Sequence, residues 1–356
     1  MIRKKWSEWK TWENWKQLAY SQIEARGLTG NLEELEAQGY TVLSPEQMGD
    51  PRLIERTGEA LLRVSEEFTG VRPNAETGEY GSSEHGNSHQ AQNWFQAIFG
   101  EDPVFEEIIQ HPLTLPLIDY FLGPGCLLSA FNGIVKWQDP VSPHEANMRI
   151  FGMGFHADTH LYPFEPLPDP PMVFNTNWCL TDYNKDDGAL AVVPESHQLR
   201  RHPRPGEAEK QAIPVEAPAG SAIVFHGNLW HGAFPRVNPG LRLTVTAYYN
   251  AHYCRPQEHF PDQVSEESLA RNGERFRQLL NVCDTLGFGN RRDLWVPRWD
   301  RGSGKTRRQI WEGTVTHHGR EYRIEKDDTI VNHVAGYARY VPVDADEHVA
   351  LGEKEG

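Results

Sequence analysis

The sequence predicts a mainly β fold, a jelly roll with helices packed on one side. Beyond residue 127 the hydrophobic period changes from helical to alternating, and in residues 241–248 apolar side chains alternate with polar ones, as in a half-buried strand. Turn signals such as Asp187-Gly188 and Ala219-Gly220 separate further short strands. Several short strands at this spacing, after two helical segments, are typical of a jelly-roll sandwich. The other strand candidates are residues 172–180, 189–193, 213–217 and 221–225.

Before residue 127 the expected elements are mostly helical. Four tryptophans recur every three residues near the N-terminus and predict an aromatic face on a helix. A short strand is expected at residues 39–43, and Asp50 and Pro51 then provide the N-cap and first position of a helix that ends at Gly70. An exposed loop (71–93) and a helical pair (104–123) follow. The tryptophans are Trp6, Trp9, Trp12 and Trp15.

The C-terminal part predicts a helix at residues 265–283 and a hairpin at 312–324, with its turn near His318-Gly319. We therefore expect three regions along the chain. Residues 1–34 form a Trp-rich helical extension, residues 35–260 form the jelly-roll domain, and residues 261–356 form a helix-and-hairpin extension. Either extension is a candidate for a homodimer contact.

Composition excludes several classes of protein. The formal net charge of −15 argues against a nucleic-acid partner, because neutralising phosphates requires a basic face. The four cysteines include no Cys-x-x-Cys pair, which argues against a zinc knuckle or a disulfide framework. No segment approaches the roughly 20 apolar residues of a membrane span, and the basic N-terminus lacks the apolar core of a signal peptide. We expect a cytoplasmic protein.

The segment FHADTH at residues 155–160 carries candidate metal ligands. On a helix His156 and His160 would share a face, as in a zinc metalloprotease, but glycines precede the segment and a proline follows it closely. The metalloprotease pattern also needs a glutamate where this chain has Ala157. On an extended chain His156 and Asp158 face one way, roughly 6.6 Å apart, and can share a metal ion. His160 would be roughly 13 Å from His156, so the third ligand should come from a distant segment.

The third ligand is expected in the segment FHGNLWHGAF. His231 is favoured because it follows the apolar run and precedes a glycine, and His226 is the alternative. Two histidines and one carboxylate leave three positions of an octahedral metal open, as in non-heme iron(II) oxygenases. Arg242 lies on the polar face of the strand at 241–248, and a buried guanidinium requires a carboxylate partner. That partner is either an acidic residue of this chain or a ligand.

Three segments together resemble the phytanoyl-CoA dioxygenase family of Fe(II)- and 2-oxoglutarate-dependent oxygenases. They are HAD at 156–158, GALAVVPESH at 188–197 and WHGAFPRVNPGLR at 230–242, and the resemblance covers residues 35–260. It implies a double-stranded β-helix in which His156, Asp158 and His231 bind iron and Arg242 holds the distal carboxylate of 2-oxoglutarate. It also implies that O2 is consumed and that a small-molecule substrate is hydroxylated, with desaturation, epoxidation or cyclisation as alternatives.

The resemblance has informative details. Trp178 matches an aromatic residue that often lies near the cosubstrate in such enzymes, and a position in the core is the alternative. Glu195 stands where the family commonly has glycine, which alters a turn, and Ala233 stands where many relatives have serine. Asp158 is present, whereas halogenating relatives replace that carboxylate by a small residue, so a halogenase is disfavoured. The residues expected to be structural are Ser196 and His197.

Two other interpretations compete with this one. A cupin-like metalloenzyme that does not use 2-oxoglutarate predicts that Arg242 pairs with a carboxylate of the chain. A non-catalytic jelly-roll binding module predicts that His156, Asp158 and His231 do not meet. The basic cluster in residues 291–308 is either a solvated surface or a site for an anion. The candidates for an apolar pocket lining are Phe155, Tyr162, Trp230 and Phe234.

Overall fold

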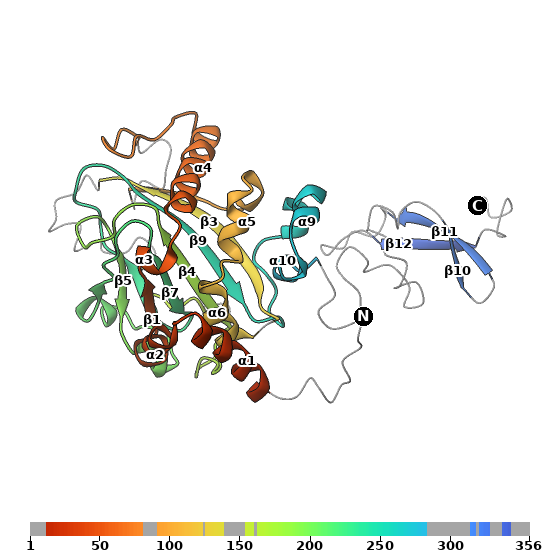
Figure 1. Cartoon of the computed structure of the whole chain (residues 1–356), viewed down its shortest axis with the longest axis horizontal. Helices are drawn as coiled ribbons and strands as arrows, with labels where there is room; N and C mark the ends of the chain where they lie inside the picture. Colours follow the sequence, from red (N-terminus) through yellow and green to blue (C-terminus); the bar gives the residue numbers. More distant parts are fainter. Residues whose placement is uncertain are drawn as a thin grey trace, which may run out of the picture. The chain divides into compact units, whose positions relative to one another are not determined.

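The fold is taken from a computed structural model of the whole chain (Figure 1). The structure describes residues 12–80, 91–123, 125–138, 154–159, 162–282, 314–317, 320–327 and 337–342. The chain divides into two compact units, Met1–Leu279 and Leu280–Gly356. Among the described residues, no helix has the length and apolar character needed to cross a membrane. Some expectations lie outside these residues: Trp6, Trp9, His160, the basic cluster at 291–308 and the turn at His318-Gly319.

The first unit contains two antiparallel sheets that form the expected jelly roll. The larger sheet has six strands in the order β1-β7-β4-β9-β3-β2, and the smaller has three in the order β6-β5-β8. The prediction of a mainly β fold is confirmed. The strands of the larger sheet are β1 (Tyr40–Leu43), β2 (Gln92–Phe95), β3 (Leu127–Lys136), β4 (Val173–Cys179), β7 (Ala222–His226) and β9 (Arg242–Asn250). Those of the smaller sheet are β5 (Leu190–Val193), β6 (Ile213–Pro214) and β8 (Trp230–Ala233).

The helices of this unit precede and follow the strands. They are α1 (Trp12–Ala25), α2 (Thr29–Gln38), α3 (Pro45–Met48), α4 (Pro51–Thr69), α5 (Val104–Ile109), α6 (Thr114–Leu122), α8 (Phe260–Gln263), α9 (Glu266–Arg271) and α10 (Glu274–Leu279). As the sequence predicts, Asp50 caps α4 by accepting the backbone N–H groups of Arg52 and Leu53. Gly70 ends α4 with a left-handed φ of 75°, a conformation that favours glycine. The helix expected at 265–283 is instead two short helices separated at Asn272 and Gly273.

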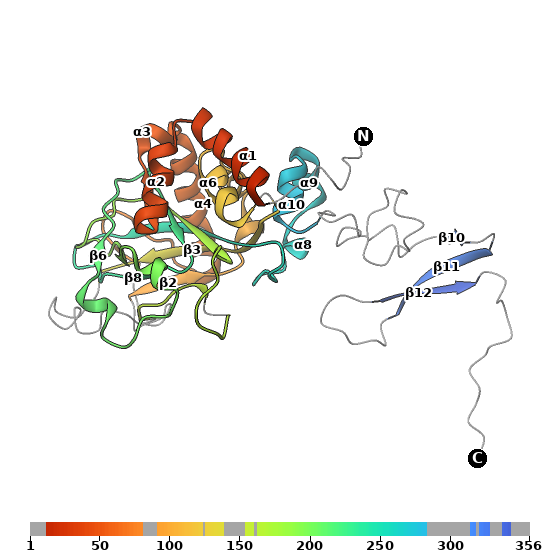
Figure 2. The ribbon, with the colours of Figure 1, turned by 90° about the horizontal axis from the view of Figure 1, so that it is seen from below.

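The helices cover one face of the larger sheet (Figure 2). On this face the ring of Phe131 contacts Phe105, with centroids 5.0 Å apart, and Phe174 stacks on Phe121 at 4.7 Å. A Cβ at Gly133 would clash with Cδ1 of Leu61 in α4, so any larger residue would force that side chain to shift. The helical layer is therefore tightly packed against alternate residues of β3 and β4.

The other face of the larger sheet turns toward the smaller sheet. Ile223 and Phe225 of β7 pack there in one buried cluster with Leu190 and Val192 of β5. Side chains alternate between the two faces of a strand, so a residue's place in the β4–β9–β3 ladder decides which layer it contacts. This inner face holds the candidate site.

The second unit contains a small antiparallel sheet of its own. Its strands are β10 (Thr314–His317), β11 (Arg320–Asp327) and β12 (Tyr337–Pro342), in the order β10-β11-β12. The first two form the hairpin that the sequence predicts, and the third was not predicted.

Candidate metal centre

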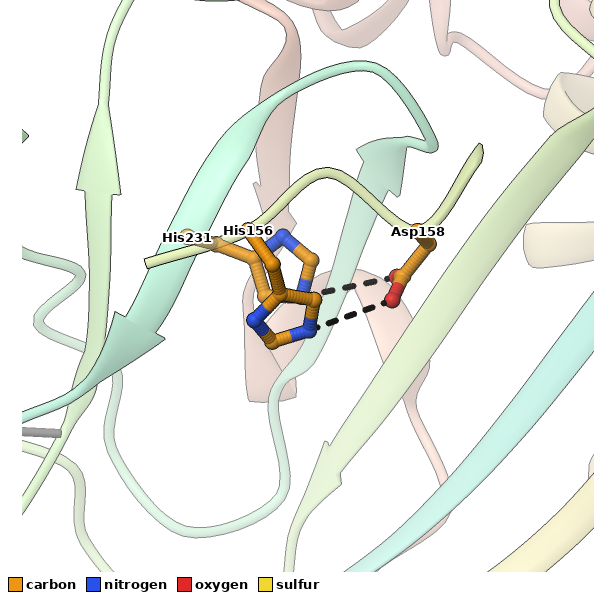
Figure 3. Close-up of side chains that lie close together, drawn as sticks. All are labelled: His156, Asp158 and His231. Carbon is orange, nitrogen blue, oxygen red and sulfur yellow. Dashed lines mark ion pairs between the residues drawn. The ribbon is translucent and has the colours of Figure 1, made fainter. Parts of the chain in front are cut away.

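Three predicted ligands, His156, Asp158 and His231, lie together (Figure 3). One ligand atom from each lies within 4.8 Å of the other two. The Nε2 atom of His156 is 3.4 Å from Oδ1 of Asp158, and the Nε2 atom of His231 is 3.4 Å from Oδ2 of the same carboxylate. Asp158 and His231 are buried, and His156 is partly exposed. The structure thus brings together segments more than seventy residues apart. Their role as iron ligands stays a prediction.

The backbone holds the two histidines opposite each other. His156 and His231 form an antiparallel bridge, with N–H to O distances of 3.0 Å and 2.9 Å in the two directions. Residues 154–158 are not helical and His156 forms a β-bridge, as the sequence predicts, while Thr159 begins a 3-10 turn. His231 is in β8, so the smaller sheet sets its position. The segment that carries His156 is attached to the sheet edge through this bridge.

Each imidazole directs Nε2 toward the carboxylate because Nδ1 is occupied. Nδ1 of His156 is 3.1 Å from the carbonyl oxygen of Gly154, and Nδ1 of His231 is 2.9 Å from that of Leu229. A carbonyl oxygen only accepts hydrogen bonds, so Nδ1 carries the proton in both rings. In the neutral tautomer each Nε2 then has a free lone pair, which is the form that binds a metal ion.

Two residues of the larger sheet orient Asp158. The amide of Asn175 in β4 donates a hydrogen bond to Oδ2 of Asp158, and the hydroxyl of Tyr248 in β9 donates to its backbone oxygen at 2.8 Å. Asn175 and Tyr248 are ladder partners, so they reach the same side of the sheet. Sequence analysis did not assign either of them to the site. The alternation of β9 does place Tyr248 on the face of Arg242, which was a usable signal.

The charge of Asp158 affects its neighbours. Burial of the His156 ring lowers its pKa, but the hydrogen bond and the negative charge of Asp158 outweigh burial, and the pKa of His156 is raised overall. Burial, with a smaller contribution from Asp158, also raises the pKa of Tyr248, so its hydroxyl stays a donor. A cation between the imidazoles would interact with the same carboxylate and replace the proton that His156 otherwise attracts.

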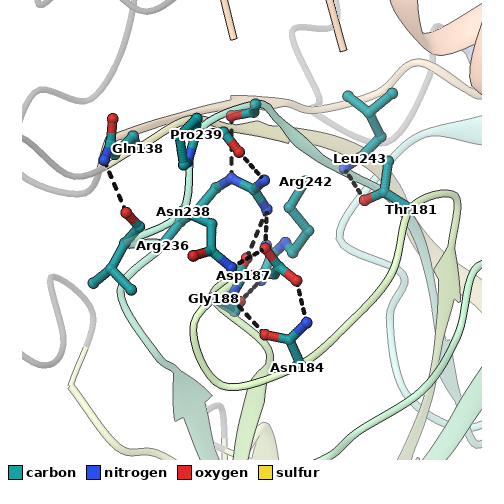
Figure 4. Close-up of polar contacts among 12 residues, drawn as sticks. Gln138, Thr181, Asn184, Asp187, Gly188, Arg236, Asn238, Pro239, Arg242 and Leu243 are labelled. Carbon is teal, nitrogen blue, oxygen red and sulfur yellow. Dashed lines mark hydrogen bonds and ion pairs between the residues drawn. The ribbon is translucent and has the colours of Figure 1, made fainter. Parts of the chain in front are cut away.

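Arg242 is buried on the inner face, and no carboxylate of the described residues pairs with it (Figure 4). Its side chain donates to the carbonyl oxygen of Gly188, and its guanidinium carbon lies 5.0 Å from the centre of the Tyr183 ring. Its Nε atom is buried and has no hydrogen-bond partner. Within the part of the chain that the structure describes, no acidic side chain lies within 4.0 Å of the guanidinium. Arg242 therefore has donors available for a ligand.

Arg236, in the same region, has an acidic partner and backbone acceptors for its guanidinium (Figure 4). Its Nη1 atom is 3.1 Å from Oδ1 of Asp187, and its Nε atom donates to the carbonyl oxygen of Gly240 at 3.1 Å. Asp187 also accepts a hydrogen bond from Asn238 at 2.9 Å. The carboxylate of Asp187 is thus engaged by Arg236 and not by Arg242.

His226, the alternative third ligand, lies elsewhere. Its ring is next to Phe174 and Phe121, with centroids 5.6 Å and 6.0 Å away, on the helix-facing side of the sheet. Its Nδ1 atom accepts the backbone N–H of Asn228 at 3.0 Å and so orders the turn before β8. His226 is not part of the metal-binding cluster.

Trp178 lies on the helix-facing side as well. It pairs with Val245 in the ladder, and its ring meets that of His111 edge to face at 5.1 Å. It is fully buried, and its indole N–H donates to Oγ1 of Thr176 at 3.3 Å. Its contact with the cosubstrate stays a prediction, and this position favours the alternative, a core residue.

Other expected residues have structural contacts. Oγ of Ser196 donates to the carbonyl oxygen of Val193 at 2.6 Å and accepts the N–H of Trp230 at 2.8 Å. Glu195 has a left-handed φ of 65°, which is why glycine suits this turn better. Trp230 is fully buried and donates to the carbonyl oxygen of Arg201 at 2.7 Å. Trp230 is therefore part of the packing, with Phe155 and Tyr162 against its cluster.

Comparison with known proteins identifies the family. The family model described as phytanoyl-CoA dioxygenase matches residues 35–244, more than half of the chain. The chain belongs to the phytanoyl-CoA dioxygenase family. This confirms the resemblance seen in the sequence. Enzymes of this family depend on iron and 2-oxoglutarate, so this chain is an iron- and 2-oxoglutarate-dependent enzyme of the dioxygenase type.

This phytanoyl-CoA dioxygenase family member is similar to several known proteins over part of its length. An uncharacterised protein of Mycobacterium tuberculosis is 25% identical over 70% of this chain and 84% of its own. Dioxygenase af480 of Aspergillus fumigatus is 27% identical over 54% of this chain and 59% of its own. Among solved structures, HygX from Streptomyces hygroscopicus with nickel and 2-oxoglutarate bound is 15% identical, with a TM-score of 0.47, and covers 64% of this chain and 88% of its own.

Proposed function

We propose that this family member hydroxylates an unactivated C–H bond of a small-molecule metabolite and releases succinate and carbon dioxide. In this proposal His156, Asp158 and His231 hold iron(II), and Arg242 binds the distal carboxylate of 2-oxoglutarate. One observation carries it. A facial set of two imidazoles and a carboxylate lies in the same inner layer as a buried guanidinium that the described chain leaves without a carboxylate.

The donor set fits iron(II). Two nitrogens and one oxygen, with no thiolate among them, suit a divalent transition metal, and both imidazoles already have the required tautomer. Three protein ligands leave room for a bidentate keto acid and for dioxygen. When bound, iron(II) supplies the one-electron chemistry that couples decarboxylation of 2-oxoglutarate to oxidation of the substrate.

The residues of the chain prepare this chemistry by position and charge. Asp158 would neutralise part of the charge of the cation, Asn175 fixes the direction of the Asp158 carboxylate, and Tyr248 holds the backbone of Asp158. The fork of Arg242 recognises a carboxylate in a layer from which protein packing excludes water. The task left to the substrate pocket is to place one C–H bond beside the metal.

The alternatives lose support for specific reasons. A cupin-like enzyme without 2-oxoglutarate predicts an acidic partner for Arg242, and the described residues provide none within 4.0 Å. A binding module without metal chemistry predicts separated ligands, whereas the three donor atoms lie within 4.8 Å. Asp158 occupies the position that a halogenating relative would leave open, which supports hydroxylation. The homodimer contact, the absence of a nucleic-acid partner and the cytoplasmic location stay predictions.

The test is the formation of succinate. The full-length protein is loaded with iron(II) without oxygen, given 2-oxoglutarate and then oxygen, and succinate is measured with and without members of a metabolite library. We expect slow succinate formation alone and faster formation with the true substrate. Absence of both iron binding and succinate from the wild-type protein would refute the proposal.

The role of Arg242 has a test of its own. Arg242→Leu should weaken 2-oxoglutarate binding about 100-fold, because it removes a desolvated, charge-assisted pair. Arg242→Lys should recover only part of the loss, since it keeps the charge without the fork. Arg63→Leu is the control: Arg63 pairs with Glu67 and Asp102 on the helical side of the unit, so its loss should leave this affinity unchanged.

A further inference from the structure

A row of three polar side chains crosses the inner face of the larger sheet. Asn132 of β3 is the ladder partner of Thr246 in β9, and Thr246 is the ladder partner of Asn177 in β4. The three strands are neighbours in the order β4-β9-β3. Directly paired residues of an antiparallel ladder project to the same side of the sheet. The side chains of Asn132, Thr246 and Asn177 therefore form one continuous row, called the amide row below.

The amide row lies between the metal-binding cluster and Arg242. On the same face, Asn175 lies two residues before Asn177 in β4, and Tyr248 lies two residues after Thr246 in β9. Both Asn175 and Tyr248 donate a hydrogen bond to Asp158. In the other direction along β9, Arg242 is four residues before Thr246, again on the same face. Measured along the strand, the row is roughly 7 Å from the Tyr248 level and roughly 13 Å from the Arg242 level.

The amide row is unusual because no hydrogen-bond partner for its side chains lies among the described residues. Asparagine is depleted in strands, and a buried amide without a hydrogen bond costs about 1–3 kcal/mol. Asn132 is only 7% exposed, and its Oδ1 atom is buried without a partner. Asn177 and Thr246 are half-buried, and among the residues with a described position none bonds to their side chains.

Two buried asparagines elsewhere in the unit, Asn31 and Asn228, are satisfied at both ends, whereas Oδ1 of Asn250 has no partner among the described residues. Asn31 donates to Oγ1 of Thr41 at 2.9 Å and accepts from Gln47 at 2.9 Å. Asn228 donates to the carbonyl oxygen of Pro168 at 3.0 Å and accepts from Thr159 at 2.5 Å. The amide row differs from Asn31 and Asn228 and lies beside the three candidate metal ligands, so a ligand is the expected partner for its polar atoms.

We propose that Asn132, Thr246 and Asn177 bind the oxygen atoms of 2-oxoglutarate between the metal-binding cluster and Arg242. The inference rests on the proposed function. Ionised 2-oxoglutarate has only acceptor oxygens, and an amide NH2 group and a hydroxyl supply matching donors. A half-turn of an asparagine amide exchanges Oδ1 with Nδ2, so the buried position at Asn132 can present a donor. These residues position the cosubstrate and take no proton from it.

The amide row can be tested without knowing the primary substrate. The measured quantity is the dissociation constant of 2-oxoglutarate, by calorimetry on full-length protein loaded anaerobically with iron(II). Thr246→Val and Asn177→Leu should each raise it about tenfold or more, because each removes a hydrogen bond to a charged ligand. Asn177→Asp should raise it further, since it adds a negative charge facing an anion. Thr246→Ser keeps the hydroxyl and should stay near wild type.

The opposite face of the same strand offers a matched control. Thr176 is one residue from Asn177, is fully buried, and accepts the indole N–H of Trp178 on the helix-facing side. Thr176→Val makes the same chemical change as Thr246→Val, so it should lower thermal stability and leave 2-oxoglutarate affinity unchanged. Unchanged affinity in Thr246→Val, Asn177→Leu and Asn177→Asp would overturn the inference.

The outcomes separate this inference from the proposed function. If the wild-type protein binds no 2-oxoglutarate, the proposed function fails first. If Arg242→Leu abolishes binding while the variants of the amide row bind as wild type, only the inference fails. Should the row variants keep their affinity and instead raise the KM of an identified primary substrate, the row belongs to that substrate and the inference is likewise wrong. Thermal denaturation of each variant confirms that it is folded.

Discussion

The two faces of β4, β7 and β9 carry different kinds of polar residue, and the difference separates chemistry from packing. On the helix-facing side Trp178 and His226 are enclosed by aromatic rings and bonded to the chain. On the inner side Asn177, Thr246 and Arg242 keep polar atoms without a partner among described residues. Residues one position apart on a strand therefore differ in purpose. A polar group satisfied by the chain stabilises the fold, and an unpartnered one that lies beside the candidate metal ligands is available to a ligand.

The strongest test of this comparison uses the two histidines. His231→Ala should lower iron affinity more than about 100-fold, a larger loss than is typical for removing a group that merely orients a ligand. His226→Gln should keep full iron stoichiometry and lose stability, because His226 only orders the turn through Nδ1. Iron content and affinity are measured after anaerobic loading. An equal loss of iron affinity in both variants would contradict the assignment of metal binding to the inner face and packing to the helix-facing side.

Removal of the helix-facing tryptophan should affect folding alone. Trp178→Ala leaves a large cavity beside His111, and we expect the free energy of unfolding to fall by about 3–5 kcal/mol. Urea denaturation measures this loss. The folded fraction should bind 2-oxoglutarate as wild type does. A selective loss of 2-oxoglutarate affinity would instead support the contact with the cosubstrate that the sequence predicts.

The pH dependence of stability should reflect the helix-facing histidine. Burial, with help from the nearby His197, lowers the pKa of His226 from 6.5 to about 3. The unfolded chain therefore takes up this proton near its ordinary pKa and the folded chain only in much stronger acid, so stability is lost as pH falls below about 6.5. Between pH 7 and pH 5 this single group should lower the free energy of unfolding by about 2 kcal/mol. Denaturant titrations at both pH values of wild type and His226→Gln measure the difference. An equally steep decline in the variant would exclude His226 as its source.

The smallest expected change in iron affinity comes from removing the Tyr248 hydroxyl, which helps to orient Asp158. Tyr248→Phe removes the hydrogen bond to the backbone oxygen of Asp158 and should weaken iron binding by roughly 1 kcal/mol, or about fivefold. Competition with a chelator measures the change. The ring remains, so thermal stability without metal should change little. A full loss of iron binding would mean that Tyr248 does more than orient Asp158.

The sequence alone predicted that His156, Asp158 and His231 lie together, but it did not predict which face of β4 each residue lies on. The alternation in β9 placed Arg242 and Tyr248 on one side because apolar and polar residues alternate there. In β4 nearly every residue is buried, so the pattern VFNTNWC does not reveal which side of the strand meets the helices. The association of Trp178 with the cosubstrate rests on the family resemblance alone, and the sequence of β4 gives no signal that places Asn175 or Asn177 at the site. Only the ladder register with β9 resolves the choice.

The main-chain bridge between His156 and His231 has a consequence for handling the protein. Hydrogen bonds of the chain itself hold the two imidazoles opposite each other, so we expect this arrangement to persist when an ion is removed or exchanged. An ion can accordingly be withdrawn and a different divalent cation supplied while the scaffold keeps its shape. Reconstitution with a redox-inert metal then yields a stable resting complex in which ligand recognition can be studied apart from turnover.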